Sequence, residues 1–196
     1  MAQAKIRIFP GTRAGHHSAP TYTLRQKKAA TFRQGAPVKI GADSGSSSVA
    51  SFTVPTTVNS GASSLVQFVA AASTGNVVGF AAGNAKPSST GDIVVNRIAE
   101  GVSFVGNLIH PTPASAVATA ANIGATAYLA RIVASVSASS ADAVGNNWGF
   151  TLYTTSVSST SNLVRGKITR LVDPASTVNG RVEVEITNGG LFREDA

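Results

Sequence analysis

Residues 179–186, Asn179-Gly180-Arg181-Val182-Glu183-Val184-Glu185-Ile186, decide the fold class. Three apolar side chains alternate with three charged ones, which is the pattern of a strand with one buried face in an antiparallel sheet. Asn-Gly directly before the strand supplies the residues that most readily adopt the positive φ angles of a tight turn. The stretch therefore predicts a strand that follows a turn and has an antiparallel neighbour.

The preceding apolar segment, residues 163–171, is the natural neighbour, because only the loop 173–180 separates the two. Antiparallel pairing would place Arg165 and Lys167 opposite Glu183 and Glu185. Each such pair contributes a few tenths of a kcal/mol (~0.2–1) and serves mainly to set the register. We interpret these carboxylates as a solvated, ion-paired face in preference to an acid and base pair.

Short apolar runs separated by Gly, Ser and Asn continue back to residue 32, at the spacing of a sandwich or barrel. Glu100-Gly101 joins two of these runs directly and predicts a hairpin. Only 114–122, rich in Ala and followed by Gly124, is typical of a short helix. The predicted strands are 37–41, 50–54, 65–71, 77–81, 92–99, 102–109, 127–134, 148–153, 163–171 and 181–186.

Charge is divided unevenly along the 196 residues. The first 39 residues hold half of the 16 Lys and Arg residues and no Asp or Glu, whereas the remainder is close to neutral. Charge concentrated in one segment indicates a place of contact. We predict two parts: an extended basic arm over residues 1–31 and a β domain over residues 32–196.

Within the arm, Lys5-Ile6-Arg7-Ile8 alternates strictly and is typical of an extended strand that can add to the sheet edge of another chain. Ile6 and Ile8 are expected to anchor the arm through apolar contacts. The basic residues are expected to meet acidic patches on a partner. The predicted contact residues are Lys5, Ile6, Arg7, Ile8, Arg13, Arg25, Lys27 and Lys28.

Residues with catalytic or metal-binding chemistry are scarce. The chain has three His and no Cys, and its nine carboxylates are scattered. His16-His17 has no nearby carboxylate to complete a metal site, and His110 fits a loop residue better than a general base. Gly75, Gly79 and Gly83 bracket a strand instead of joining a strand to a helix, so they do not form a phosphate loop. We expect no enzymatic activity, no cofactor and no metal.

Two other binding functions stay open. The basic arm, with Tyr22 and Phe32 nearby, could bind nucleic acid, although its charges are dispersed among Pro and Gly and the rest of the chain adds no basic stripe. Trp148 and Tyr153 could stack on a sugar in a receptor- or glycan-binding module of a virion fibre or tail, although Trp148 is better interpreted as core. No apolar run approaches the ~18 residues of a membrane span, so we expect a soluble protein without a membrane partner.

From residue 32 onward the sequence resembles the head decoration, or cement, proteins of tailed bacteriophages. The stretches that carry this resemblance are 32–38, 77–82, 93–105 with Phe104, 123–129, and Val172-Asp173-Pro174 together with 177–182. They are strand and turn motifs, and the long basic arm and the Ser-rich loops at 44–48 and 156–161 depart from the simplest members.

The resemblance implies an all-β fold, namely a compact antiparallel β-barrel or β-tulip-like domain with an extended N-terminal arm and at most one short helix. It implies a structural virion protein, made in the host cytoplasm and bound to the outer surface of the capsid, which bridges neighbouring major capsid protein subunits. The expected partners are the major capsid protein and further copies of the chain, as a homotrimer or alternatively a dimer. No cofactor is implied.

Overall fold

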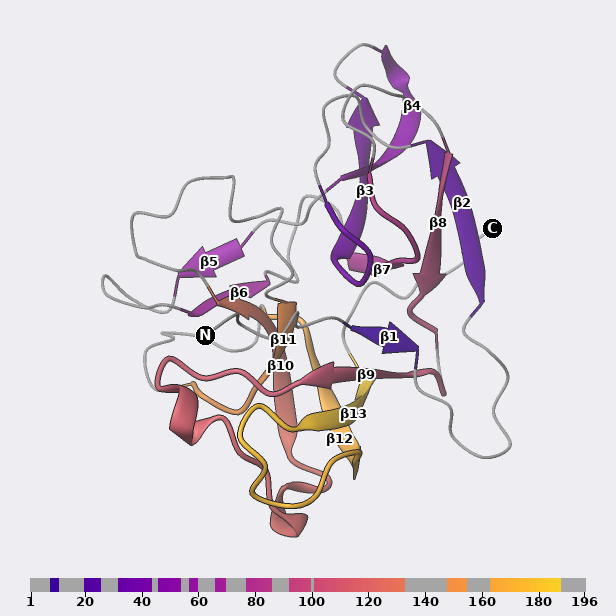
Figure 1. The fold of residues 1–196 in the computed structure, drawn as a ribbon. Coiled ribbons are helices and arrows are strands. Elements are labelled where there is room, and N and C mark those ends of the chain that lie inside the picture. The colour runs from indigo at the N-terminus through magenta and orange to yellow at the C-terminus, as the bar shows by residue number, and fades with distance from the viewer. Residues whose placement is uncertain are drawn as a thin grey trace.

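The protein folds almost entirely into antiparallel β-sheet in a computed structural model that describes residues 8–10, 20–25, 32–43, 46–53, 57–59, 66–69, 77–85, 92–99, 101–132, 148–154 and 163–187 (Figure 1). The strands are β1 (Phe9–Pro10), β2 (Thr21–Arg25), β3 (Pro37–Asp43), β4 (Ser46–Thr53), β5 (Thr57–Asn59), β6 (Val66–Val69), β7 (Val77–Ala81), β8 (Asp92–Arg97), β9 (Ser103–Asn107), β10 (Thr126–Ile132), β11 (Trp148–Thr151), β12 (Arg165–Leu171) and β13 (Arg181–Ile186). The prediction of an all-β antiparallel fold is confirmed.

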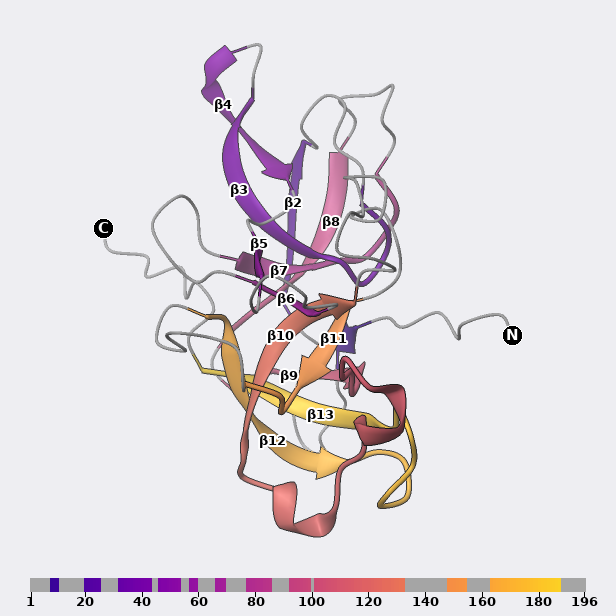
Figure 2. The same cartoon turned by 90° about the vertical axis from the view of Figure 1, so that its left-hand side faces the viewer.

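The larger sheet has eight strands in the order β1-β9-β13-β12-β10-β6-β5, with β11 paired to β10. Tyr128 of β10 pairs with β11 on one edge and with β12 on the other. β11 then returns towards the end of β9, where Ile109 N–H donates to the Phe150 carbonyl at 2.8 Å. The sheet therefore curls into a half-barrel, visible in the lower part of Figure 2.

The smaller sheet has five strands in the order β2-β8-β7-β3-β4, all antiparallel, and lies above the half-barrel in Figure 1. One hydrophobic core joins the two sheets. Phe80 of β7 and Phe104 of β9 meet in it, with ring centroids 4.5 Å apart. The described strands therefore belong to one folded unit.

The pairing of β12 with β13 confirms the central prediction, but the register is only half as expected. Lys167 lies opposite Glu185, one of the two predicted carboxylates, whereas Glu183 lies opposite Arg170 instead of Arg165 or Lys167. A register shift between Ile168 and Arg170 brings Arg170 opposite Glu183 in place of Thr169, since an extra residue in one strand moves every later partner by one place.

The hairpin predicted at Glu100-Gly101 is wrong. Gly101 has the positive φ of a turn, at 74°. However, β8 before it pairs with β2 and β7, whereas β9 after it pairs with β1 and β13. The chain crosses from one sheet to the other here, and Ile98 is buried at the crossing. A turn residue alone does not say which strand lies next to which.

The predicted short helix at 114–122 is replaced by two single-turn 3₁₀ helices, η1 (Pro113–Ser115) and η2 (Ala120–Asn122). Pro113 opens the first, and Thr119 begins the second by donating its N–H to Asn122 Oδ1 at 2.7 Å. The β-branched residues Val117 and Thr119 between them disfavour a continuous α-helix.

Two stretches of the predicted arm belong to the sheets of the body. Phe9–Pro10 pairs with β9, and Thr21–Arg25 pairs with β8 along its whole length. The boundary predicted at residue 31 therefore does not separate an arm from a domain at these strands. Residues 1–7, 11–19 and 26–31 lie outside the described part of the chain.

Candidate interaction surface

The structure places two of the predicted contact residues. Ile8 is 1% exposed in the core, so its predicted role as an apolar anchor on a partner is wrong. The position that a side chain on Gly106 would occupy is filled by Phe150 and by Ile8 Cγ1, which is 3.1 Å from an ideal Cβ. Arg25 ends β2, in register with Asp92 of β8. Lys5, Ile6, Arg7, Arg13, Lys27 and Lys28 lie outside the described residues.

The aromatic pair considered for sugar stacking does not form an exposed platform. Trp148 is 2% exposed and belongs to the core, with the Arg131 guanidinium 5.6 Å from its ring centroid. Tyr153 meets His110 edge to face, with centroids 4.8 Å apart. His110 Nδ1 also accepts the Thr112 N–H at 2.9 Å. The glycan-binding alternative therefore loses the tryptophan on which it depended.

Glu183 is ion-paired as expected, but it is not solvated. Its side chain is 1% exposed, accepts a hydrogen bond from Ser103 Oγ, and lies 2.8 Å from Arg170 Nη2. The burial and both partners make it a structural group. Among the described residues, no three His, Asp or Glu side chains lie close enough together to hold a metal ion.

The most distinctive surface lies at the end of the half-barrel where η1 and η2 are found. Two segments form it, residues 111–125 between β9 and β10 and residues 174–180 between β12 and β13. Neither contains a Lys, Arg, His, Asp or Glu. We call the two segments together the uncharged end.

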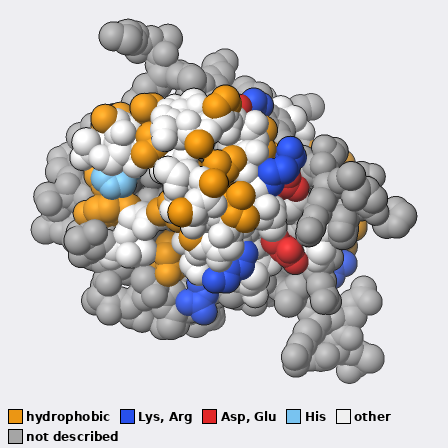
Figure 3. All heavy atoms as spheres, turned by 90° about the horizontal axis from the view of Figure 1, so that it is seen from below, with side chains coloured by type: hydrophobic (Ala, Val, Ile, Leu, Met, Phe, Trp, Pro, Cys, Tyr) orange, Lys and Arg blue, Asp and Glu red, His pale blue; other side chains and the backbone are white. Residues whose placement is uncertain are grey.

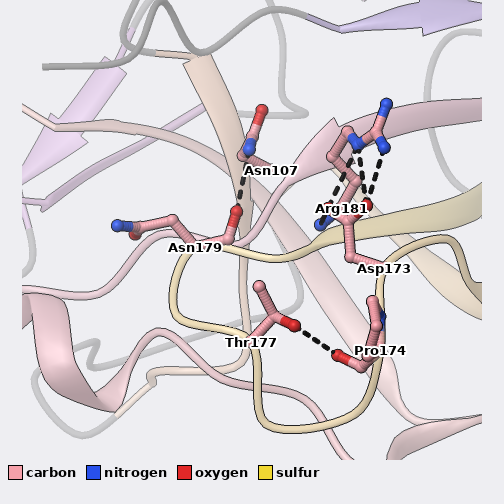
Figure 4. Close-up of polar contacts among 6 residues, drawn as sticks. All are labelled: Asn107, Asp173, Pro174, Thr177, Asn179 and Arg181. Atoms are coloured by element: carbon pink, nitrogen blue, oxygen red, sulfur yellow. Dashed lines mark hydrogen bonds and ion pairs between the residues drawn. The ribbon is translucent and has the colours of Figure 1, made fainter.

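Backbone hydrogen bonds fasten the two segments of the uncharged end to each other. Asn179 N–H donates to the Ala116 carbonyl at 2.7 Å, and Ser176 N–H donates to the Ala118 carbonyl at 2.8 Å. From the strand side, Asn107 Nδ2 donates to the Asn179 carbonyl at 2.8 Å (Figure 4). Ser176 and Asn179 hold the left-handed conformation, with φ of 64° and 53°. The surface is therefore built on a fixed backbone.

An ion pair closes the base of the 174–180 loop (Figure 4). Arg181 donates from Nη2 to Asp173 Oδ1 at 2.6 Å and from its backbone N–H to Asp173 Oδ2 at 2.8 Å. The side-chain hydrogen bonds from Arg181, followed by the backbone one, lower the pKa of Asp173, and the same pair raises the pKa of Arg181. Asp173 and Arg181 thus neutralise each other beside the uncharged end.

The uncharged end exposes large apolar side chains. Ile123 is 52% exposed and Val178 is 50% exposed, the highest fractions among the large hydrophobic residues of the described chain. Seen from below in Figure 3, hydrophobic and uncharged side chains gather at the centre, with Lys, Arg, Asp and Glu side chains mainly to the right of this group and below it. A fixed, exposed and apolar surface of this kind is typical of a protein contact site.

Beneath the loop, a cavity of about 10 Å³ lies among Ala118, Leu171, Pro174 and Thr177, with space for a single water molecule. It is too small for a ligand.

Sequence reasoning did not identify the uncharged end as a site. Residues 111–125 carry no ionisable side chain, but residues 44–85 form a longer stretch of the same kind, so this pattern does not single out the site. Its exposure was not visible, because an Ala-rich stretch free of charge is equally typical of buried structure.

No protein-family model, no curated protein and no solved structure matches this chain. Within the described residues, none of the helices has the length and apolar character needed to cross a bilayer.

Proposed function

We propose that this protein is a structural component of a virion which decorates and stabilises the icosahedral head of a tailed bacteriophage, bridging neighbouring major capsid protein subunits from the outer surface. The observation that carries the proposal is the attachment of the basic N-terminal region to both sheets of the body. Ile8 lies in the core, β1 belongs to the larger sheet and β2 belongs to the smaller one.

The N-terminal strands β1 and β2 divide the basic region into segments that adjoin strands of the body in the sequence. Lys5 and Arg7 precede the buried Ile8, Arg13 lies between β1 and β2, and Lys27 and Lys28 follow β2. These cations contact acidic patches on the shell, with Arg25 and Ile6 beside them. Any force on them passes into the β1–β9 and β2–β8 ladders, so that separating two shell subunits also strains the decorating protein.

The energy of attachment comes from multiplicity. An exposed ion pair contributes at most about 1 kcal/mol, so one basic segment binds weakly. A homotrimer, or alternatively a dimer, presents several such segments at one junction and gains avidity without any new type of contact. The protein is made in the host cytoplasm and joins the head from outside.

Binding to undecorated heads tests the proposal. In one variant, Lys5, Arg7 and Arg13 are replaced by Gln, and in a control of equal charge Arg33, Arg165 and Lys167 of the body are replaced by Gln. The control should co-sediment with heads as the wild type does, whereas the N-terminal variant should lose binding. Equal binding by both variants would reject the basic contacts, and a wild-type protein that binds no heads would reject the function.

The same proteins test the nucleic-acid alternative. Binding through phosphate contacts falls steeply with salt. This alternative is correct if the wild type binds duplex DNA at low salt, releases it at moderate salt, and binds no heads under either condition. In that case the basic region binds nucleic acid and not the capsid.

A further inference from the structure

We propose that the uncharged end, residues 111–125 and 174–180, is the surface through which copies of this chain associate with each other. The inference deepens the proposed function, because it names the contact face of the homo-oligomer suggested there. Four features argue for a second copy as the occupant: charge, apolar exposure, rigidity and the contrast with the other exposed apolar site.

The charge pattern favours a self-contact. Close to a symmetry axis, a residue of one copy meets the same residue of another, so an ionisable side chain on the axis would face its own like charge. The uncharged end avoids this, because neither of its segments carries an ionisable residue. Asp173 and Arg181 at its border already neutralise each other through contacts of 2.6–3.2 Å.

Exposed apolar side chains and a rigid backbone both favour association. Ile123 and Val178 leave half of their surface in water, and burying them against a partner removes this apolar surface from water, which is favourable. The bonds from Asn179 to Ala116 and from Ser176 to Ala118 fix the loops before contact. Association therefore loses little entropy from ordering them.

The other exposed apolar site of the described chain has a different character. Tyr22 and Val94 are 40% and 41% exposed on the β2–β8 pair, where the register sets Arg25 opposite Asp92. Residues of both charges stand at that end of the strand pair, and Lys27 and Lys28, which are assigned to the shell, follow β2 directly in the sequence. Capsid binding and self-association therefore use different surfaces. The capsid binds at the charged region, and further copies of the chain bind at the uncharged end.

Single cysteines test the contact directly, because the chain has none of its own. Under mild oxidation, Val178→Cys should yield a covalent dimer on a non-reducing gel, whereas Val94→Cys should remain single at the same protein concentration. Equal cross-linking at both positions, or none at position 178 or in the parallel variant Ile123→Cys, would overturn the assignment.

Charge substitutions give a second, reversible test by sedimentation velocity. Val178→Asp and Val178→Lys should each sediment as a folded monomer of 19.8 kDa with the far-ultraviolet circular dichroism spectrum of the wild type, and Val94→Asp should remain an oligomer. Mixing the Asp variant at position 178 with a Lys variant at 178 or 123 should restore the oligomer, since opposite charges then meet. An unchanged oligomer in Val178→Asp, or a monomeric wild type, would refute the inference.

The outcome is separable from that of the proposed function. A wild type that oligomerises through this end but binds no heads would uphold the interface and reject the decoration role. A Val178→Asp monomer that still binds heads, although more weakly, would support both.

Discussion

Replacing Ile8 by Ala tests whether the start of the chain is part of the folded body. Ile8 is 1% exposed, and its Cγ1 lies beside Phe150 in the space above Gly106. The substitution removes three carbon atoms, and at about 0.8 kcal/mol per buried methylene the transfer term alone is about 2.4 kcal/mol. The surrounding residues fill the vacated space only in part, and the cavity that remains adds a further cost. The expected loss of unfolding free energy is therefore about 3–4 kcal/mol.

Urea unfolding followed by tryptophan fluorescence measures this loss, because Trp148 is the single tryptophan and lies in the same core. With a slope of about 2 kcal/mol per molar urea, the midpoint should fall by about 1.5–2 M. The control is Val94→Ala, which shortens an apolar side chain that is 41% exposed and lies outside the uncharged end. If the two variants unfold within about 0.5 kcal/mol of each other, Ile8 is not packed and the reasoning fails.

Three further outcomes follow from the strands β12 and β13 and the loop between them. Gly166→Ala should destabilise the protein by about 3 kcal/mol in the same urea assay, because a Cβ at this position would meet the Glu185 carbonyl and lie 2.6 Å from Val184 Cγ1. The control Gly83→Ala should leave the stability unchanged, because there is open space around Gly83. NMR titration should give Asp173 a pKa below its ordinary value, so its stabilising effect is complete above the unfolded pKa and is lost as the pH falls through the lower folded one. Asp173→Asn should remove that part of the acid dependence, at a cost below about 1 kcal/mol at neutral pH, and an unchanged profile would contradict the assignment. Arg170→Ala should lower the free energy of unfolding by about 1–2 kcal/mol, because it leaves the buried Glu183 without its cation. Adding Glu183→Gln in the same chain should recover part of that loss. If the effects of the two substitutions simply add, the two side chains are not coupled.

The alternation in residues 181–186 was enough to predict the fold class and the β12–β13 pair. A period of two places side chains on alternate faces whatever the neighbouring strands are. The register was beyond reach because a period of two is equally compatible with pairings that differ by two residues, and the irregularity between Ile168 and Arg170 leaves no mark in the hydrophobic pattern. The crossing at Gly101 was missed for a related reason, since a turn fixes the local direction of the chain and not the partner of the next strand.

The N-terminal region was misjudged because composition was taken as a sign of separation. Pro10 and the basic residues around β2 argued against packed structure, yet a two-residue edge strand tolerates Pro, and β2 lies at the edge of its own sheet. Removing residues 1–30 would therefore delete Ile8 and both strands along with the basic contacts. Substitutions are the better probe of this region.

The position of β9 has a consequence for how the protein is made. One neighbour of this strand, β1, precedes it in the chain, and its other neighbour, β13, follows it after a long separation in sequence. The curled sheet cannot be completed until β13 has been synthesised, and such distant pairings make folding slow. Until then, one edge of β9 stays unpaired and is open to wrong partners.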